Sequence, residues 1–74
     1  MANLESPLAG KMLEINVKVG QHVDEDHEIM VIESMKMENP LYSPATGTVK
    51  EIRVKVGDRV NEGDVLAVID STSS

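Results

Sequence analysis

Residues 43–70 read SPATGTVKEIRVKVGDRVNEGDVLAVID, and they repeat residues 6–33, SPLAGKMLEINVKVGQHVDEDHEIMVIE, without a gap. The two copies are offset by 37 residues and are identical at 13 of their 28 positions. Self-similarity at a fixed offset is typical of a body built from repeated supersecondary units. A unit this short cannot bury its apolar face alone, so we expect the two copies to pack on each other with two-fold pseudo-symmetry.

Each copy has the pattern of β-structure. In the second copy, residues 48–56 alternate between apolar and polar side chains. The apolar positions are Val49, Ile52, Val54 and Val56. The alternation slips once between Val49 and Ile52, which predicts a bulge. Gly57 follows at a position where we expect a positive φ. Residues 65–70, VLAVID, then predict a buried strand.

The predicted fold is all-β, with two small antiparallel sheets facing each other as a sandwich or flattened barrel, that is, a barrel-sandwich hybrid. Residues 1–74 are predicted to form a single domain, whose halves 6–33 and 43–70 are joined by a hairpin over 34–42. In a body with two-fold pseudo-symmetry, this hairpin and the C-terminal tail lie at opposite ends. Lys36 is therefore expected at the tip of the central hairpin, far from both termini.

Composition excludes several classes of function. The 74 residues contain no cysteine, so there are no disulfides and no Cys-based metal sites. Thirteen acidic and seven basic residues give a net charge of −6, which disfavours nucleic acid and anionic membranes as partners and suits a soluble monomer. No apolar run reaches transmembrane length, and the N-terminus does not read as a signal peptide. These features predict a cytoplasmic protein.

Lys36 lies between two methionines in SMKMENPLY (residues 34–42), which breaks the repeat. A lone lysine is usually a solvated surface charge. Two features set Lys36 apart from an ordinary surface lysine. It lies at the junction of the two copies, and its neighbours are methionines, which are adaptable at binding surfaces. On a continuous strand Met35 and Met37 would share one face and pack in the core, whereas at a tight turn they would be exposed. Both interpretations stay open at this point.

Other candidate sites are weaker. Residues 24–28, DEDHE, gather carboxylates around His27, but the aligned residues of the second copy form a plain turn and the calcium-loop pattern is absent. His22 aligns with Arg59 and is expected to be a solvated strand residue. No catalytic Ser/His/Asp or Cys/His arrangement and no phosphate-binding glycine loop is present. We therefore predict no catalytic residues and no metal site in this chain.

The segment ESMKM (residues 33–37), set between two β-rich copies, resembles the biotinyl domain of biotin carboxyl carriers. The resemblance extends over nearly the whole chain, because residues 6–23 are similar to the opening of that family and residues 43–70 to its second half. The gapless repeat leaves no room for the protruding thumb that some bacterial carriers insert in the first half. The small size also resembles free-standing biotin/lipoyl attachment proteins.

The resemblance implies that biotin is joined to Lys36 by an amide. A lysine amine is protonated at neutral pH and is a poor nucleophile, so it needs an activated acyl donor, which a biotin protein ligase supplies. The carboxybiotin then shuttles CO₂ between a biotin carboxylase and a carboxyltransferase, and the carrier itself is no enzyme. Glu33, Met35 and Met37 match the residues that the ligase and partner enzymes recognise, while Ser34 departs from the usual alanine.

Two other functions remain open. Lipoyl domains share this fold and a central lysine, usually as Asp-Lys-Ala, so lipoate or dual biotin and lipoate attachment is an alternative. The same sandwich also occurs as an unmodified structural module, for example in efflux-pump adaptors. The methionines on both sides of Lys36 favour biotin. The acceptor of the carboxyl group is left open by the sequence.

Overall fold

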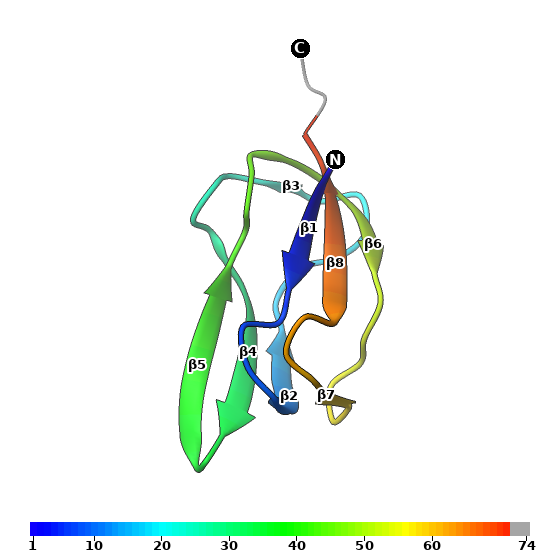
Figure 1. Ribbon diagram of the computed structural model, residues 1–74. Helices are drawn as coiled ribbons and strands as arrows, with labels where there is room; N and C mark the ends of the chain where they lie inside the picture. The colour runs from blue at the N-terminus through cyan, green and yellow to red at the C-terminus, as the bar shows by residue number, and fades with distance from the viewer. Residues whose placement is uncertain (72–74) are drawn as a thin grey trace.

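Strands and turns make up the whole of the described chain. The computed structural model describes residues 1–71, and within them it contains strands but no helix (Figure 1). The strands are β1 (Ala2–Glu5), β2 (Gly10–Ile15), β3 (His22–Val23), β4 (Glu28–Ser34), β5 (Met37–Tyr42), β6 (Gly47–Ile52), β7 (Arg59–Val60) and β8 (Val65–Asp70). They form two four-stranded antiparallel sheets, with the orders β1-β8-β6-β3 and β5-β4-β2-β7. The predicted all-β fold is confirmed.

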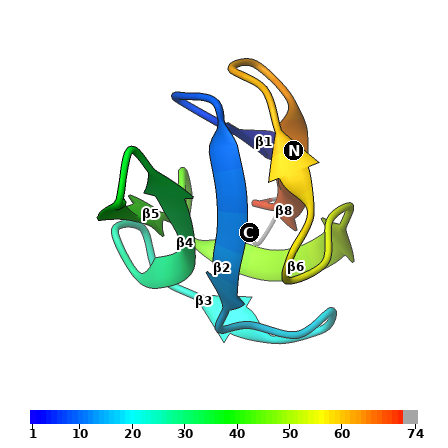
Figure 2. The same ribbon diagram turned by 90° about the horizontal axis from the view of Figure 1, so that it is seen from below.

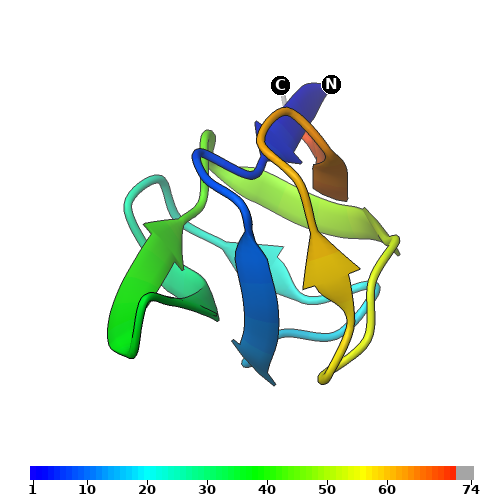
Figure 3. The same ribbon diagram turned by 60° about the horizontal axis from the view of Figure 1, so that its bottom comes forward.

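The two sheets enclose one apolar core. Figure 3 shows β5 in green, β2 in blue and β7 in yellow standing in front of the other sheet. Seen from below, β2 lies between β4 and β7 (Figure 2). The buried core residues are Leu4, Met12, Val17, Val23, Ile29, Met30, Ile32, Leu41, Val49, Val60, Leu66, Ala67 and Ile69. This core contains no aromatic ring.

The repeat of the sequence is also a repeat of the structure. β2 and β6 have bounds 37 residues apart, as do β3 and β7. The same offset carries β4 onto β8, and it converts each sheet order into the other. Each sheet takes two strands from the chain before the β4–β5 turn and two from the chain after it. The two-fold pseudo-symmetry is therefore confirmed, and the two halves interlock.

The predicted bulge is present in both halves. Between β6 and β8 the register shifts between Val49 and Glu51, inside the interval where the alternation slips. The equivalent shift between β2 and β4 falls between Met12 and Glu14. An extra residue on one strand bends that strand and increases its twist. The bulges therefore help each small sheet to wrap around the shared core.

Val56 does not belong to the apolar set that the alternation predicted. Val56 is 63% exposed, because β6 ends at Ile52 and the chain then leaves the sheet. The backbone N–H of Asp58 donates to the carbonyl of Lys55 at 3.0 Å, so Val56 and Gly57 are the central residues of a turn. Gly57 has φ +96°, as predicted, and glycine in the second central position is typical of type II turns.

Replacing Gly57 with valine is expected to destabilise the protein by about 1–2 kcal/mol, the cost of forcing a side chain into left-handed backbone. An added Cβ would meet no atom within 4 Å, so the cost is conformational and not a clash. Urea unfolding measures it, with Val56→Ala in the same turn as a control that should change little. Wild-type stability in Gly57→Val would show that the positive φ is wrong.

The two ends of the molecule differ. The start of β1 and the end of β8 lie at one end, and the β4–β5 turn lies at the other (Figure 1). The predicted position of Lys36 at the tip of the central hairpin is therefore confirmed, and it is far from the start of β1 and the end of β8. Residues 72–74 of the predicted single domain lie outside the described residues. Within residues 1–71, no helix has the length and apolarity needed to cross a membrane.

Candidate functional site

The β4–β5 hairpin ends in a two-residue turn. Ser34 and Met37 form the last cross-strand pair, and only Met35 and Lys36 lie between them. Their φ angles are +55° and +66°, so both residues have left-handed backbone. These are the signs of a type I′ turn, whose twist matches that of the flanking strands. The turn thus fixes Lys36 at one position at the end of a sheet.

The residues in this turn are poor choices for its backbone. Type I′ turns strongly favour Asn-Gly, because left-handed backbone costs other residues free energy. Here a methionine and a lysine occupy both central positions. Departures from local conformational preference tend to cluster at functional sites. We therefore infer that these side chains are present for their chemistry and not for the stability of the hairpin.

Both methionines of the turn region face solvent. Met35 is 92% exposed and Met37 is 68% exposed. Met12 and Met30, in contrast, are fully buried in the core. The question left open by the sequence is thus decided, because neither Met35 nor Met37 packs in the core. Two large flexible apolar side chains at the tip offer a contact surface to a partner.

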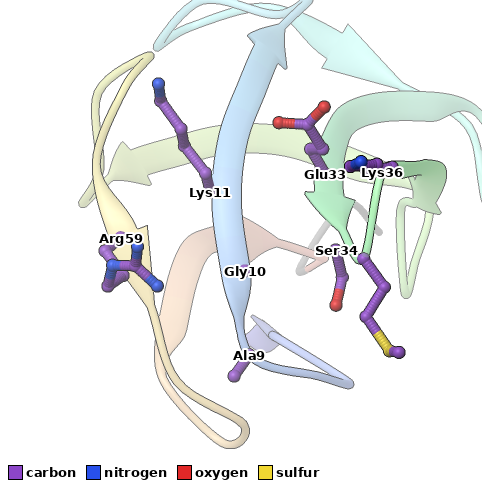
Figure 4. Close-up of a pocket in the computed structure, with 8 residues that line it drawn as sticks. Ala9, Gly10, Lys11, Glu33, Ser34, Lys36 and Arg59 are labelled. Carbon is purple, nitrogen blue, oxygen red and sulfur yellow. The ribbon is translucent and has the colours of Figure 1, made fainter.

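A hollow of about 310 Å³ opens beside Lys36. Its lining residues are Ala9, Gly10, Lys11, Glu33, Ser34, Met35, Lys36 and Arg59. In Figure 4, Glu33, Ser34 and Lys36 stand on the hairpin side, while Lys11 and Arg59 stand on the far side of β2. Glycine is required at position 10, because a Cβ there would clash with the carbonyl oxygen of Glu33.

The Lys36 amine is exposed and is not held by a carboxylate. Two ion pairs occur within residues 1–71, His22 with Asp24 at 3.4 Å and Arg53 with Glu51 at 3.0 Å. Lys36 takes part in neither of them. Glu33, three residues earlier, is half-buried at the edge of the hollow. An exposed amine at a fixed tip suits covalent attachment of a group that must reach another protein.

The cluster around His27 shows no sign of a site. Within residues 1–71, no group of three or more His, Asp or Glu side chains is arranged to hold a metal ion. Asp26 and His27 lie in the turn between β3 and β4, and the N–H of Asp26 donates to the carbonyl of Ser43 at 3.1 Å. His22 is exposed and pairs with Asp24. These residues contribute to the turn and to the solvated surface.

Comparison with known proteins establishes the family. A sequence profile of the biotin and lipoyl family, described as "Biotin-requiring enzyme", matches residues 2–69. The chain is a biotin/lipoyl attachment domain. The resemblance carried by ESMKM and the flanking repeats is confirmed. Membership implies attachment of biotin or lipoate.

Several carboxylases contain a similar domain. The mitochondrial propionyl-CoA carboxylase alpha chains of Caenorhabditis elegans and Caenorhabditis briggsae are each 46% identical over 37 residues, which is 50% of this chain and 5% of theirs. Urea carboxylase of Kluyveromyces lactis superposes with a TM-score of 0.87 at 35% identity, over 93% of this chain and 6% of that one. A single-chain, multi-domain long-chain acyl-CoA carboxylase gives 0.83 at 29% identity, over 89% and 7%. The attachment domain thus spans a small part of each relative.

Sequence reasoning missed the two charged residues on the far side of the hollow, Lys11 and Arg59. A signal for them was present, because both break the repeat: Thr48 stands at the position equivalent to Lys11, and His22 at the position equivalent to Arg59. In a domain with internal symmetry, a position that differs between the two copies indicates a function that only one end of the domain has. The same comparison had already singled out the segment that contains Lys36.

Proposed function

We propose that this domain is a biotin carboxyl carrier and that Lys36 is the residue to which biotin is joined. The observation that carries the proposal is the exposed lysine in a conformationally costly two-residue turn, with an exposed methionine on each side. The carboxylases that contain similar domains support biotin over lipoate. The chain then acts as a carrier for other enzymes' active sites.

The attachment reaction uses the Lys36 amine as a nucleophile. A biotin protein ligase removes a proton from the ammonium group, and the amine nitrogen attacks the carbonyl carbon of an activated biotinyl ester. The new C–N bond forms as the activating group leaves, and the product is an amide. Because the turn has only two residues, the backbone at Lys36 is already ordered before binding. This reduces the conformational entropy that the carrier loses when Lys36 enters the active site of the ligase.

Biotin supplies a ring nitrogen that accepts a carboxyl group at a biotin carboxylase and gives it up at a carboxyltransferase. The domain's own contribution is position. The tip lies at the end of the molecule away from the start of β1 and the end of β8, which supports a role for this end in presenting the attached group. Met35 and Met37 are proposed as apolar contacts for the ligase and partner enzymes, and Glu33 as a polar contact.

The proposal is tested by intact mass after incubation with a biotin protein ligase, ATP and biotin, with lipoate and a lipoate ligase in a parallel reaction. We expect one biotinyl increment, which peptide mapping places on Lys36. A lipoyl increment alone would transfer the protein to the lipoyl class. Increments in both separate reactions would identify a dual attachment protein. No increment in either, on folded protein, would favour an unmodified structural module.

A variant with Met35→Ala and Met37→Ala tests the recognition role within the same assay. Both side chains are exposed, so melting should be unchanged while the rate of biotin attachment falls by about tenfold or more, the loss of roughly 1.4 kcal/mol of contact free energy. Replacement of the exposed Val19, in the connection between β2 and β3, by alanine is the matched control. Equal rates for the two variants would remove the methionines from the recognition surface.

A further inference from the structure

Four ionisable side chains form a row across the sheet that carries the hairpin. The register places Arg59 of β7 opposite Lys11 of β2, Lys11 opposite Glu33 of β4, and Glu33 opposite Glu38 of β5. Directly paired residues share a face of a sheet. The next pair along, Met12 with Ile32, is fully buried, so the row lies on the outer face. The row is sorted by charge, with two cations and then two carboxylates.

Like charges directly opposite each other on neighbouring strands are destabilising. The scaffold does not require this arrangement, because the equivalent positions of the other half are His22, Thr48 and Asp70. The cross-strand pair equivalent to Arg59 and Lys11 is thus His22 and Thr48, which has no two fixed positive charges. The end that presents Lys36 carries an unfavourable pair of cations that the other end avoids.

These cations are free to bind a ligand. Both ion pairs found within residues 1–71 lie elsewhere, at His22–Asp24 and Arg53–Glu51. Lys11 and Arg59 join Lys36 around the hollow, so three of the seven basic residues of a chain with net charge −6 lie at one site. The acidic residues 24–28 lie toward the end with the termini (Figure 1). The hollow is therefore lined by three cations and one carboxylate, Glu33, and is net positive in a chain whose net charge is −6.

We propose that Lys11, Lys36 and Arg59, here named the basic triplet, dock an acidic surface of the enzyme that acylates Lys36. This inference rests on the proposed function. An arginine presents a planar fork that matches a carboxylate, and complementary charges steer association and fix orientation. Ala9 and Gly10, which also line the hollow, have the smallest side chains and so leave space there for an Asp or Glu side chain of the partner.

The triplet also distinguishes the substrate from the product of the attachment reaction. Acylation removes a proton from Lys36 and converts its ammonium into a neutral amide, so three positive charges become two. An acidic docking surface therefore binds the unmodified carrier more tightly than the modified one. The ligase would release its product readily and select unmodified carrier from a mixture of both.

The test compares two variants that lower the net charge equally. Lys11→Gln with Arg59→Gln removes the two unreactive cations of the triplet, and Lys18→Gln with Lys50→Gln removes two cations outside the hollow. With a biotin protein ligase, we expect the first variant to raise KM for the carrier by about 3- to 30-fold, as two exposed charge pairs allow, with kcat nearly unchanged. The control should stay within about twofold, in keeping with rim charges remote from the contact.

Three further readouts decide the inference. Raising NaCl should raise the KM of the wild type and remove its advantage over the triplet variant, because salt screens exposed charges. The melting temperature of that variant should stay close to the wild-type value, since it loses both the unfavourable pair of Arg59 with Lys11 and the favourable pair of Lys11 with Glu33. A marked fall would indicate a structural role. The biotinylated carrier should inhibit the ligase more weakly than the unreactive Lys36→Arg variant, which keeps the charge.

Failure of this inference is distinguishable from failure of the proposed function. If wild-type protein accepts biotin on Lys36 and the triplet variant shows the same KM and salt dependence, the docking role is wrong and the carrier function stands. A wild-type chain that accepts no biotin would overturn both proposals. An equal rise of KM in the triplet variant and in the control would also reject the docking role, because the effect would then follow net charge alone.

Discussion

Replacing Lys36 with glycine is expected to prevent biotin attachment and, at the same time, to make the protein more stable than the wild type. Lys36 has φ +66°, where a side chain costs about 1–2 kcal/mol and glycine is unstrained. Part of this gain is lost because glycine increases the entropy of the unfolded chain, so the net gain is about 0.5–1 kcal/mol. In a domain of this size, 1 kcal/mol shifts the melting temperature by about 4–8 °C.

Intact mass and thermal unfolding measure the two effects on the same sample. Lys36→Ala is the matched control: it lacks the amine and keeps the strained backbone, so it should be unmodified at about wild-type stability. A fall in melting temperature for Lys36→Gly would contradict the left-handed turn. An intact biotinyl increment on Lys36→Gly would show that another lysine is the attachment site.

Removing core volume is expected to have the largest effect on stability. Ile32 and Ile69 occupy equivalent places in the two halves and are both fully buried. Truncating such a residue to alanine costs about 2–5 kcal/mol. A domain of this size has a total stability of about 4–11 kcal/mol, from the usual free energy per residue. Ile32→Ala and Ile69→Ala should each lose a large part of this, and the double variant should be unfolded or nearly so.

Urea unfolding gives the two losses, with Val56→Ala as a control in an exposed loop. That control is expected to change stability by less than about 0.5 kcal/mol. Because the halves are equivalent, the losses at Ile32 and Ile69 should be similar in size. A loss below about 1 kcal/mol at either position would mean that the site collapses or is hydrated, contrary to close packing between the sheets.

Most of the fold was predictable from the repeat in the sequence. Because the copies align without a gap, one strand assignment served for both, and the bulge after Val49 and the positive φ at Gly57 followed from local pattern. The repeat extends further than the identical residues show. β1 matches the second part of β5 at the same offset, and only Leu4 and Leu41 coincide there, both buried.

The failures have physical reasons. Val56 alternates correctly with Val54, but alternation carries no information once the chain has left the sheet for a turn. The turn at Met35 and Lys36 lacked the Asn-Gly signal of a type I′ turn, so its left-handed backbone was not predictable from propensity. Lys11 and Arg59 meet only through the pairing of β2 with β7, which depends on the tertiary arrangement.

The interlocking of the halves affects how the chain comes apart. Each sheet takes two strands from each side of the β4–β5 turn, so neither half possesses a complete sheet. Cleavage of the backbone between Met35 and Lys36 would therefore leave two fragments that complement each other and reassemble as a noncovalent heterodimer. If the hairpin instead opened into a straight connection, two intact chains would exchange halves. Each Lys36 would then lie in a linker that joins the exchanged halves.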